Sequence, residues 1–283
     1  MHAMSYIFYI PSAPLSDYIK YFYYPNGSVP YPRERILPLP ALDLKINFGG
    51  PLRVYDADHA KPLATLCESW MAGLWNKHHI VDWPADMEHF GVSFKPGGAY
   101  PFFRLPLSEL HNQVLPLDVI WRNLAAEIRE RLYDGPTLQA RFALLEQFLL
   151  TRLDAPPSQL KAVQWAVTEL ARSRGGLSIR ILSERMSMSQ KHLITRFKQI
   201  VGCTPKELAR LYRFAHILDS IDLAQPVDWT LLAHQFYYHD QSHFVRDFRE
   251  FTGYTPSHYL WLRRQVHAEN PERAEHPRLL PTG

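Results

Sequence analysis

The feature that most constrains this chain is a repeat in its C-terminal half. The same residues recur 51 positions apart: His192 with His243, Phe197-Lys198 with Phe248-Arg249, Gly202 with Gly253, and Thr204-Pro205 with Thr255-Pro256. In each copy the glycine ends one helix, and the Thr-Pro pair begins the next with a cap and a proline at the first helical position. An offset held at all these positions indicates a duplicated helix-turn-helix unit.

The residues around the repeat predict a run of helices with short polar breaks. Apolar residues three and four apart, preceded by Ser, Thr or Asp caps, place helices at 160–172, 179–185, 190–200, 206–223, 229–236 and 241–251, with a last one from Pro256. The connecting helix at 206–223 would be about 27 Å long. Since major-groove faces on one side of B-DNA are about 34 Å apart, such a helix could hold both units on one face of the DNA.

The second helix of each unit has an apolar side and a polar side. Leu182, Leu193 and Phe197, and likewise Leu232, Phe244 and Phe248, are expected to pack the two helices of a unit together. The candidate DNA-contacting residues are Gln190, Lys191, Thr195, Arg196 and Lys198 in the first unit and Gln241, Ser242, His243, Arg246 and Arg249 in the second. An outer side of donors fits a major groove, and helix starts at Ser189 and Asp240 suit phosphates. Periodicity alone leaves open a structural bundle with a solvated polar face.

Charge divides unevenly along the 283 residues. The prolines of Asp154-Ala155-Pro156-Pro157-Ser158 interrupt helical periodicity and predict domains at 1–157 and 158–265, followed by a flexible tail at 266–283. Residues 1–157 hold 14 Lys and Arg against 16 Asp and Glu, and residues 158–283 hold 17 against 12, so the net charge of +3 arises in the second part. A basic second domain favours a polyanionic partner such as DNA.

Cysteine usage and hydropathy predict a cytoplasmic protein. Cys67 and Cys203 are far apart and form no CxxC pair, which excludes a disulfide scaffold and a cysteine-based zinc module. The apolar stretch at 1–10 has no basic residues before it, and no other apolar run reaches membrane-spanning length. Neither a signal peptide nor a membrane partner is therefore predicted, and Cys203 is expected to serve packing.

Residues 160–262 resemble the DNA-binding domain of the AraC/XylS family of bacterial transcriptional regulators. The most specific matching stretch is Asp240-Gln241-Ser242-His243-Phe244-Val245-Arg246-Asp247-Phe248-Arg249, followed by Gly253-Tyr254-Thr255-Pro256-Ser257-His258-Tyr259. The first unit matches less closely, through Leu182-Ser183, His192-Leu193 and Gly202-Cys203-Thr204-Pro205. The resemblance implies seven helices, two helix-turn-helix motifs joined by a long helix, and double-stranded DNA as partner. It places base reading at Lys191 and Thr195 and at Gln241, Ser242 and Arg246.

Two positions depart from the family pattern. Thr195 stands where the family usually has arginine, with Arg196 one position later, so base reading by the first unit is expected to be weaker. Tyr237-Tyr238 stands where the family has a Gly-Phe turn. Because the positive φ of such a glycine is costly for tyrosine, we expect a reshaped turn and an altered docking angle for the second unit.

Residues 1–157 predict a sheet-rich domain closed by two helices. Strands are predicted at 43–48, 53–55, 69–75 and 89–94, and helices at 16–23, 119–133 and 137–153. The fold class is therefore α+β: a sheet-rich N-terminal domain precedes an all-α domain. A barrel-like arrangement is one form that the sheet-rich domain could take. The runs Leu37-Pro38 to Asn47-Phe48 and Val92 to Gly98 resemble the sensing domains of the same family.

The sequence predicts a transcription regulator and not an enzyme. Residues 1–157 contain no Gly-rich phosphate loop and no serine nucleophile elbow, so no catalytic residue and no cofactor is predicted. His78, His79, His89 and His111 have no spacing that turns them inward together, and no metal site is predicted. The alternative is an N-terminal small-molecule or metal-dependent catalytic domain tethered to DNA, which a cavity with convergent His or carboxylate groups would favour.

The N-terminal half is expected to bind a small-molecule effector, at residues that its sequence does not single out. Its aromatic residues are mostly core, with a fraction available to line a cavity. The helices over 119–153 carry both apolar stripes and a charged face, which fits either a dimer contact or a solvated surface. A homodimer and, for an activator, RNA polymerase are the further expected partners.

Overall fold

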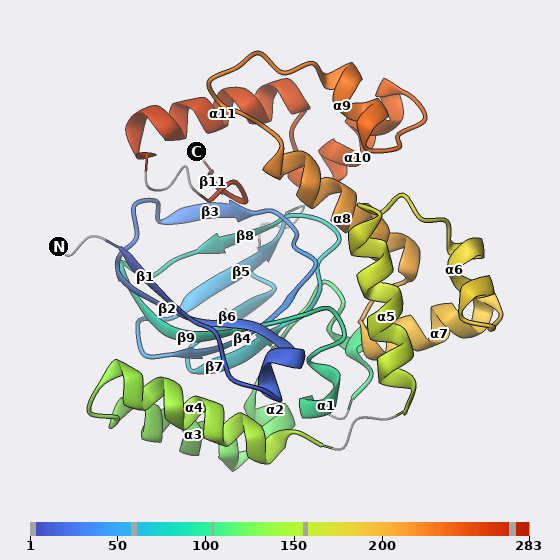
Figure 1. The fold of residues 1–283 in the computed structure, drawn as a ribbon. Coiled ribbons are helices and arrows are strands. Elements are labelled where there is room, and N and C mark those ends of the chain that lie inside the picture. The colour runs from blue at the N-terminus through green and yellow to red at the C-terminus, as the bar shows by residue number, and fades with distance from the viewer. Residues whose placement is uncertain (1–3, 58–60, 104, 155–157, 272–275, 283) are drawn as a thin grey trace.

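The structure is a computed structural model that describes residues 4–57, 61–103, 105–154, 158–271 and 276–282 (Figure 1). The predicted domain boundary at 157/158 and residues 272–275 and 283 of the predicted tail lie at or beyond the edges of the described residues. Figure 1 shows a sheet-rich N-terminal half with helices below it and a helical C-terminal half above it and to its right. The predicted α+β class is confirmed.

Two antiparallel sheets face each other in the N-terminal half. One has six strands in the order β1-β2-β9-β4-β7-β10, and the other has five in the order β11-β3-β8-β5-β6. The strands are β1 (Ser5–Tyr9), β2 (Ile19–Ser28), β3 (Arg33–Ile36), β4 (Leu42–Asn47), β5 (Leu52–Asp56), β6 (Ala64–Leu66), β7 (Ser69–Ala72), β8 (His79–Asp82), β9 (Asp86–Phe94), β10 (Val114–Pro116) and β11 (Leu279–Pro281). The predicted sheet-rich domain is therefore made of two separate sheets, which do not close into a barrel.

Helices cover the outer face of the six-stranded sheet. Phe22 and Phe90 on that face lie 6.4 and 5.2 Å, ring centre to ring centre, from Phe142 of α4. Arg122 has a φ of 51° and divides the predicted helix at 119–133 in two. The helices of this half are α1 (Tyr100–Phe103), α2 (Asp118–Trp121), α3 (Asn123–Tyr133) and α4 (Leu138–Arg152).

The predicted helix at 16–23 is wrong. A 3-10 turn at Leu15–Asp17 leads directly into strand β2, whose first residues are Ile-Lys-Tyr-Phe-Tyr-Tyr. Aromatic and β-branched residues favour strands, and this strand is covered on both sides. Phe22 packs against α4, whereas Tyr21 and Tyr23 face the other sheet, so the alternation of apolar and polar residues that marks a strand is missing.

The described part of the C-terminal half contains seven helices, as predicted. They are α5 (Ser158–Arg172), α6 (Ile179–Arg185), α7 (Gln190–Ile200), α8 (Pro205–Asp219), α9 (Trp229–Gln235), α10 (Gln241–Thr252) and α11 (Pro256–Glu269). The connecting helix α8 ends at Asp219, where the backbone N–H of Ser220 donates to the carbonyls of His216 and Ile217. Its 15 residues span about 22 Å, less than the predicted 27 Å.

The C-terminal segment returns to the N-terminal half. Strand β11 pairs antiparallel with β3, Leu279 lying opposite Ile36, and Leu280 is fully buried. The predicted flexible tail at 266–283 is therefore wrong for its described residues, because α11 continues to Glu269 and residues 279–281 complete a sheet. No helix in the described ranges has both the length and the hydropathy that a membrane crossing requires.

Candidate nucleic-acid interface and inter-sheet cavity

Local caps start the second helix of each unit. The Ser189 hydroxyl accepts the His192 backbone N–H at 3.2 Å, and the Asp240 carboxylate accepts that of His243 at 2.7 Å. Accepting this bond lowers the pKa of Asp240 below its ordinary value. These caps confirm the predicted starts of α7 and α10.

The apolar side of each second helix is buried, which turns its polar side outward. Leu193 and Phe197 in α7, and Phe244 and Phe248 in α10, are at most 1% exposed. The structure brings most of the predicted DNA-contacting residues to the two outer surfaces. The exposed ones are Gln190, Lys191, Thr195 and Lys198 on α7 and Gln241, Ser242, Arg246 and Arg249 on α10.

Two predicted residues, one in each unit, are instead held by their neighbours. Half-buried Arg196 donates to Nε2 of His192 at 3.0 Å and to Oε1 of Gln199 at 3.3 Å. His243 lies with its ring 5.2 Å from that of Tyr238 and its Nε2 3.9 Å from Asp247. Their side chains therefore stabilise their own helices.

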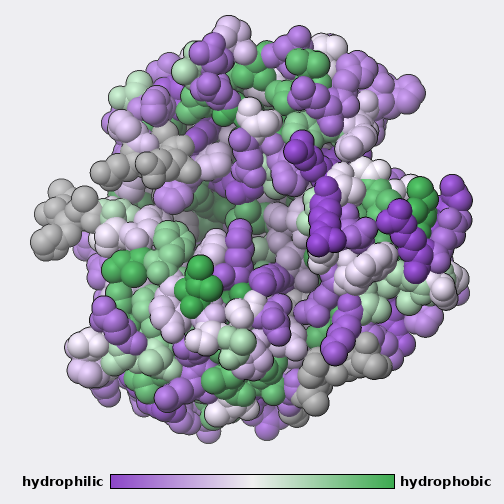
Figure 2. Space-filling model, in the orientation of Figure 1, coloured by the Kyte–Doolittle hydropathy of each residue, from purple (hydrophilic) through white to green (hydrophobic). Residues whose placement is uncertain are grey.

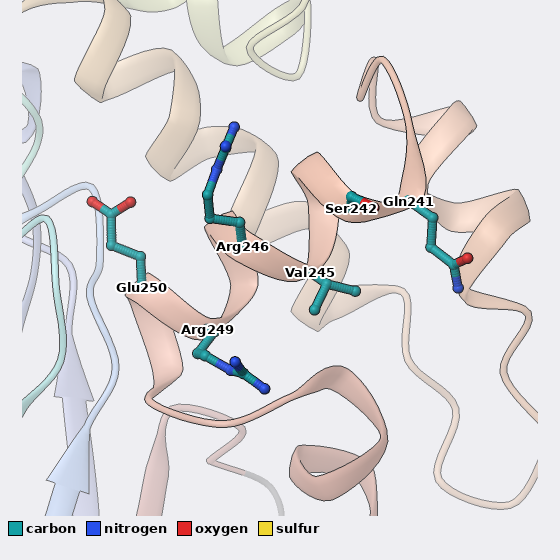
Figure 3. Close-up of a pocket in the computed structure, with 6 residues that line it drawn as sticks. All are labelled: Gln241, Ser242, Val245, Arg246, Arg249 and Glu250. Carbon is teal, nitrogen blue, oxygen red and sulfur yellow. The ribbon is translucent and has the colours of Figure 1, made fainter.

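The outer side of α10 forms a concavity of about 620 Å³ (Figure 3). Its lining residues are Gln241, Ser242, Val245, Arg246, Arg249 and Glu250. Figure 3 shows the side chains of Arg246 and Arg249 extending from the helix in different directions. Within the described ranges, neither guanidinium has a hydrogen bond or an ion pair, so both are available to bases or phosphates.

The second recognition helix is fastened to the connecting helix by ion pairs. Arg210 of α8 donates to both oxygens of Asp247, at 2.9 and 3.2 Å, and to Glu250 at 2.7 Å. Asp247 is buried, so this bidentate pair neutralises a carboxylate beneath α10. Burial lowers the pKa of Arg210, but the bonds to Asp247 and Glu250 raise it above its ordinary value.

The first recognition helix is fastened to the N-terminal half instead. Gln199 near the end of α7 donates to the Tyr100 hydroxyl at 2.9 Å. Gly202 follows α7 with a φ of +96°, and a Cβ there would lie 2.9 Å from the Leu107 carbonyl oxygen. Both the conformation and the close approach therefore require glycine at this position.

The turns between the paired helices differ from the expectation. Ser187 and Tyr237 occupy equivalent places with φ of 52° and 62°. In both turns the next residue donates to a carbonyl five residues back: Met188 to Ser183 and Tyr238 to Ala233. Tyr237 thus adopts the conformation expected of glycine, and the predicted reshaping is limited to one added residue, His239, before the cap of α10.

A second hollow lies between the two sheets, with a volume of about 300 Å³. Aromatic and apolar residues from both sheets line it, together with a few charged ones that the sequence did not single out. The charged lining residues are Lys20, Asp43, Lys45 and Arg278, and the aromatic ones include Tyr21, Tyr23 and Trp83. On β4, Asp43 and Lys45 alternate with buried Leu42, Leu44 and Ile46, a pattern that would equally describe a strand with one face in water.

The four histidines that the sequence offered for a metal do not gather. His79 and His89 line the cavity, but His111 lies 3.8 Å from Glu207 and His78 lies near Gly253. Burial lowers the pKa of His79 to about 3 and that of His89 well below its ordinary value, so both are neutral. Among the described residues, no three His, Cys, Asp or Glu side chains lie close enough together to hold a metal ion. Cys203 is buried, as expected, and burial raises the pKa of its thiol.

Comparison with known proteins separates the two halves in the same way. Residues 182–261 match the family described as a helix-turn-helix domain, and residues 7–116 match a domain of unknown function, DUF6597. A search of curated proteins finds no match.

Solved structures to which this chain shows some similarity include ToxT of Vibrio cholerae. ToxT from Vibrio cholerae O395 is 10% identical, with 91% of this chain and 97% of that chain covered and a TM-score of 0.44. Unsaturated fatty acid-bound ToxT from strain SCE256 is 11% identical, covering 92% and 97%, with a TM-score of 0.43. The AraC-like transcriptional activator CuxR is 14% identical, covering 72% and 78%, with a TM-score of 0.30.

The pair of helix-turn-helix units joined by α8 defines the class of the C-terminal half: it is a double helix-turn-helix domain. More specifically, the chain carries a helix-turn-helix domain of the AraC type behind an N-terminal domain of unknown function. A domain of this type indicates DNA-binding transcription regulation.

Proposed function

We propose that this protein is a sequence-specific transcription regulator that reads adjacent major-groove segments with α7 and α10. The observation that carries the proposal is the outer side of α10, where Arg246 and Arg249 are exposed beside Gln241 and Ser242 and form no hydrogen bond or ion pair with any described residue. Such donors suit guanine, adenine and phosphate contacts. Lys191 and Lys198 on α7 supply a second set of cations. This function requires no catalytic residue, and it places the protein in the cytoplasm.

The test is selection of binding sites by the full-length chain from random double-stranded DNA. The selected site should contain two separate elements, and its log affinity should fall with log salt at a slope of about −3 or steeper, because several phosphates are neutralised. The matched control is Lys61→Ala, which removes an exposed charge from the N-terminal half and should leave slope and site unchanged. No enriched site, or a flat salt dependence, would contradict the proposal.

We infer further that an effector bound in the inter-sheet cavity modulates DNA binding. The supporting observation is the cavity itself, which is mostly aromatic with a few polar groups, as ligand sites are. The alternative of a metal-dependent catalytic domain has less support, since no three His, Cys, Asp or Glu side chains of the described ranges lie close enough together to hold a metal ion. A thermal-shift screen of the full chain against small metabolites tests the inference, because a ligand of the folded state raises its stability; no hit would contradict it.

A homodimer and contact with RNA polymerase remain part of the proposal. The outer sides of α3 and α4 carry exposed charges together with exposed Tyr133 and Leu150, a surface that a second copy could cover. Two charged residues of these helices have a different role, since Arg129 donates to the Asn47 carbonyl and Arg141 to the Gly135 carbonyl. Sedimentation of the full chain tests this point: a monomer at all concentrations would contradict the dimer.

A further inference from the structure

The C-terminal segment forms part of the wall of the inter-sheet cavity. His276, Pro277, Arg278 and Leu279 all line it, although they lie more than 180 positions after the strands that form the rest. Figure 2 shows a recess in the middle of this face of the molecule, with apolar surface inside and polar residues around it. Strand β11 of this segment lies beside β3, and β8 lies on the other side of β3 (Figure 1). The cavity is thus a joint product of both ends of the described chain.

Lys45 is a half-buried cation, and no hydrogen bond to its side chain is found among the described residues. Its side chain lies in the cavity, with Nζ 6.0 Å from the ring centre of Trp83. No acceptor or carboxylate among the described residues lies within hydrogen-bond distance of this Nζ. Burial lowers the pKa of Lys45, and nearby Asp43 opposes that effect. An ammonium group that is partly withdrawn from water is stabilised when an anion or a set of acceptors binds it.

Arg278 supplies a second cation from the C-terminal segment. Its Nη2 lies 3.6 Å from Asp219, and its buried Nε has no partner among the described residues. With Lys20 at the exposed end, the lining carries three cations and one carboxylate. That carboxylate, Asp43, accepts a hydrogen bond from the Tyr23 hydroxyl at 3.4 Å. Since His79 and His89 are neutral, the cavity has an excess of positive charge.

We propose that the inter-sheet cavity binds an organic anion with an aromatic or apolar body, whose charged group contacts Lys45 and Arg278. The aromatic rings of Tyr21, Tyr23 and Trp83 supply the surface for that body. The role of this site as an effector site rests on the proposed function. Binding of the anion to the cavity does not require DNA binding.

The same segment connects the anion site to the second recognition unit. The Tyr259 hydroxyl of α11 donates to the Pro277 carbonyl at 2.8 Å, and Arg263 donates to the His276 carbonyl at 3.0 Å. On the paired strand β3, Arg35 donates to the Thr252 carbonyl at the end of α10 at 2.7 Å. An anion that draws Arg278 into the cavity therefore acts on the strand pair that holds α10 and α11, and occupancy reaches the DNA-reading surface by this route.

The experiment titrates the full-length chain with two fluorescent dyes that differ in one charged group, anilinonaphthalenesulfonate and the uncharged N-phenylnaphthylamine. The wild type should bind the sulfonate dye more tightly than the uncharged dye. Lys45→Met should weaken sulfonate binding about tenfold and leave the uncharged dye within about twofold, because a charge-assisted hydrogen bond contributes on this scale. Lys45→Arg should restore most of the sulfonate affinity, and Lys61→Met should change neither dye.

Three results would overturn the anion site: equal affinity of the two dyes for the wild type, equal weakening of both by Lys45→Met, or the same effect from Lys61→Met. Amide exchange measured with and without the sulfonate tests the C-terminal wall. Protection of residues 33–36 and 279–281 is expected, and unchanged exchange there would overturn the role of that segment. Binding of the selected DNA tests the proposed function separately. If the protein does not bind that DNA but still prefers the sulfonate dye, the proposed function fails and the anion site stands.

Discussion

The two helix-turn-helix units share a frame but are fastened to different parts of the molecule. Asp247 and Glu250, which bind Arg210 of the connecting helix, stand 51 residues after Arg196 and Gln199. In the first unit Gln199 instead donates to Tyr100 of the N-terminal half. The duplicated positions have thus diverged where each unit is anchored, while the caps and buried residues kept their roles. This difference predicts that the units respond separately to mutation.

The largest expected effect is on the anchor of the second unit. Arg210→Ala leaves Asp247 buried without its partner and should lower the free energy of unfolding by about 3 kcal/mol, since a broken buried pair is strongly destabilising. The side chains of Arg210 and Asp247 are 19% and 6% exposed. Urea denaturation measures the change. Arg180→Ala is the matched control in the first unit, because its ion pair with Glu184 is exposed and should contribute less than about 0.5 kcal/mol.

The next largest expected effect is a difference between the two units in base discrimination. Arg246→Ala should reduce discrimination at one base pair of the selected DNA by about 1–3 kcal/mol, as expected for an arginine on guanine. Thr195→Ala, at the equivalent position of the first unit, should cost less than about 1 kcal/mol, because the Thr195 hydroxyl already donates to the Lys191 carbonyl at 3.0 Å. Competition binding with substituted sites measures both. A larger effect at Thr195 would reverse the assignment of the stronger reader.

Low pH should reduce the stability of the protein through protonation of Glu207, which lies at the end of the first unit. Burial raises the pKa of Glu207, but bonds from Thr204 and the nearby His111 and Asn76 lower it, and the net pKa is below its ordinary value. A carboxyl group with a lowered folded pKa stabilises the protein above its unfolded pKa, and that stability is lost as pH falls through the folded value. The wild type should therefore lose up to about 1 kcal/mol below about pH 4.5 that Glu207→Gln does not lose.

Denaturation at a series of pH values measures this difference. The capping bond itself is available to glutamine as well, so the variant isolates the titration. Glu184→Gln, which removes an exposed carboxylate of the same unit, is the control and should run parallel to the wild type. The second unit has His258 at the position equivalent to Glu207. Parallel curves for Glu207→Gln and the wild type would contradict the prediction.

The smallest expected effect compares the two turns. Ser187→Gly should stabilise the protein by about 0.5–1 kcal/mol, because glycine adopts a positive φ without steric cost. Tyr237→Gly should stabilise it less, because the Tyr237 ring lies so near Gly176 that a Cβ there would come within 2.5 Å of it. Thermal unfolding measures both. A larger gain for Tyr237→Gly would mean that the ring contributes nothing to packing.

Prediction from sequence was most accurate where structure is set locally. The helices at 179–185 and 190–200 were placed to the residue, since caps and breaks lie beside them. The helix at 16–23 was wrong because a strand buried on both faces lacks alternation. Lys45 was missed because its alternating strand has the pattern of a solvated face, and only the second sheet turns that face into a cavity. Arg278 was missed because its place depends on pairing between residues 36 and 279.

That pairing also sets an order in which the chain can be completed. Strand β3 lies between β8 and β11, so its second edge stays open until residues 279–281 arrive, after the whole DNA-reading half has been synthesised. An open edge can pair with another chain. The newly made N-terminal half therefore depends on its own distant segment to protect it from self-association, and a fragment cut between the halves would keep that edge exposed.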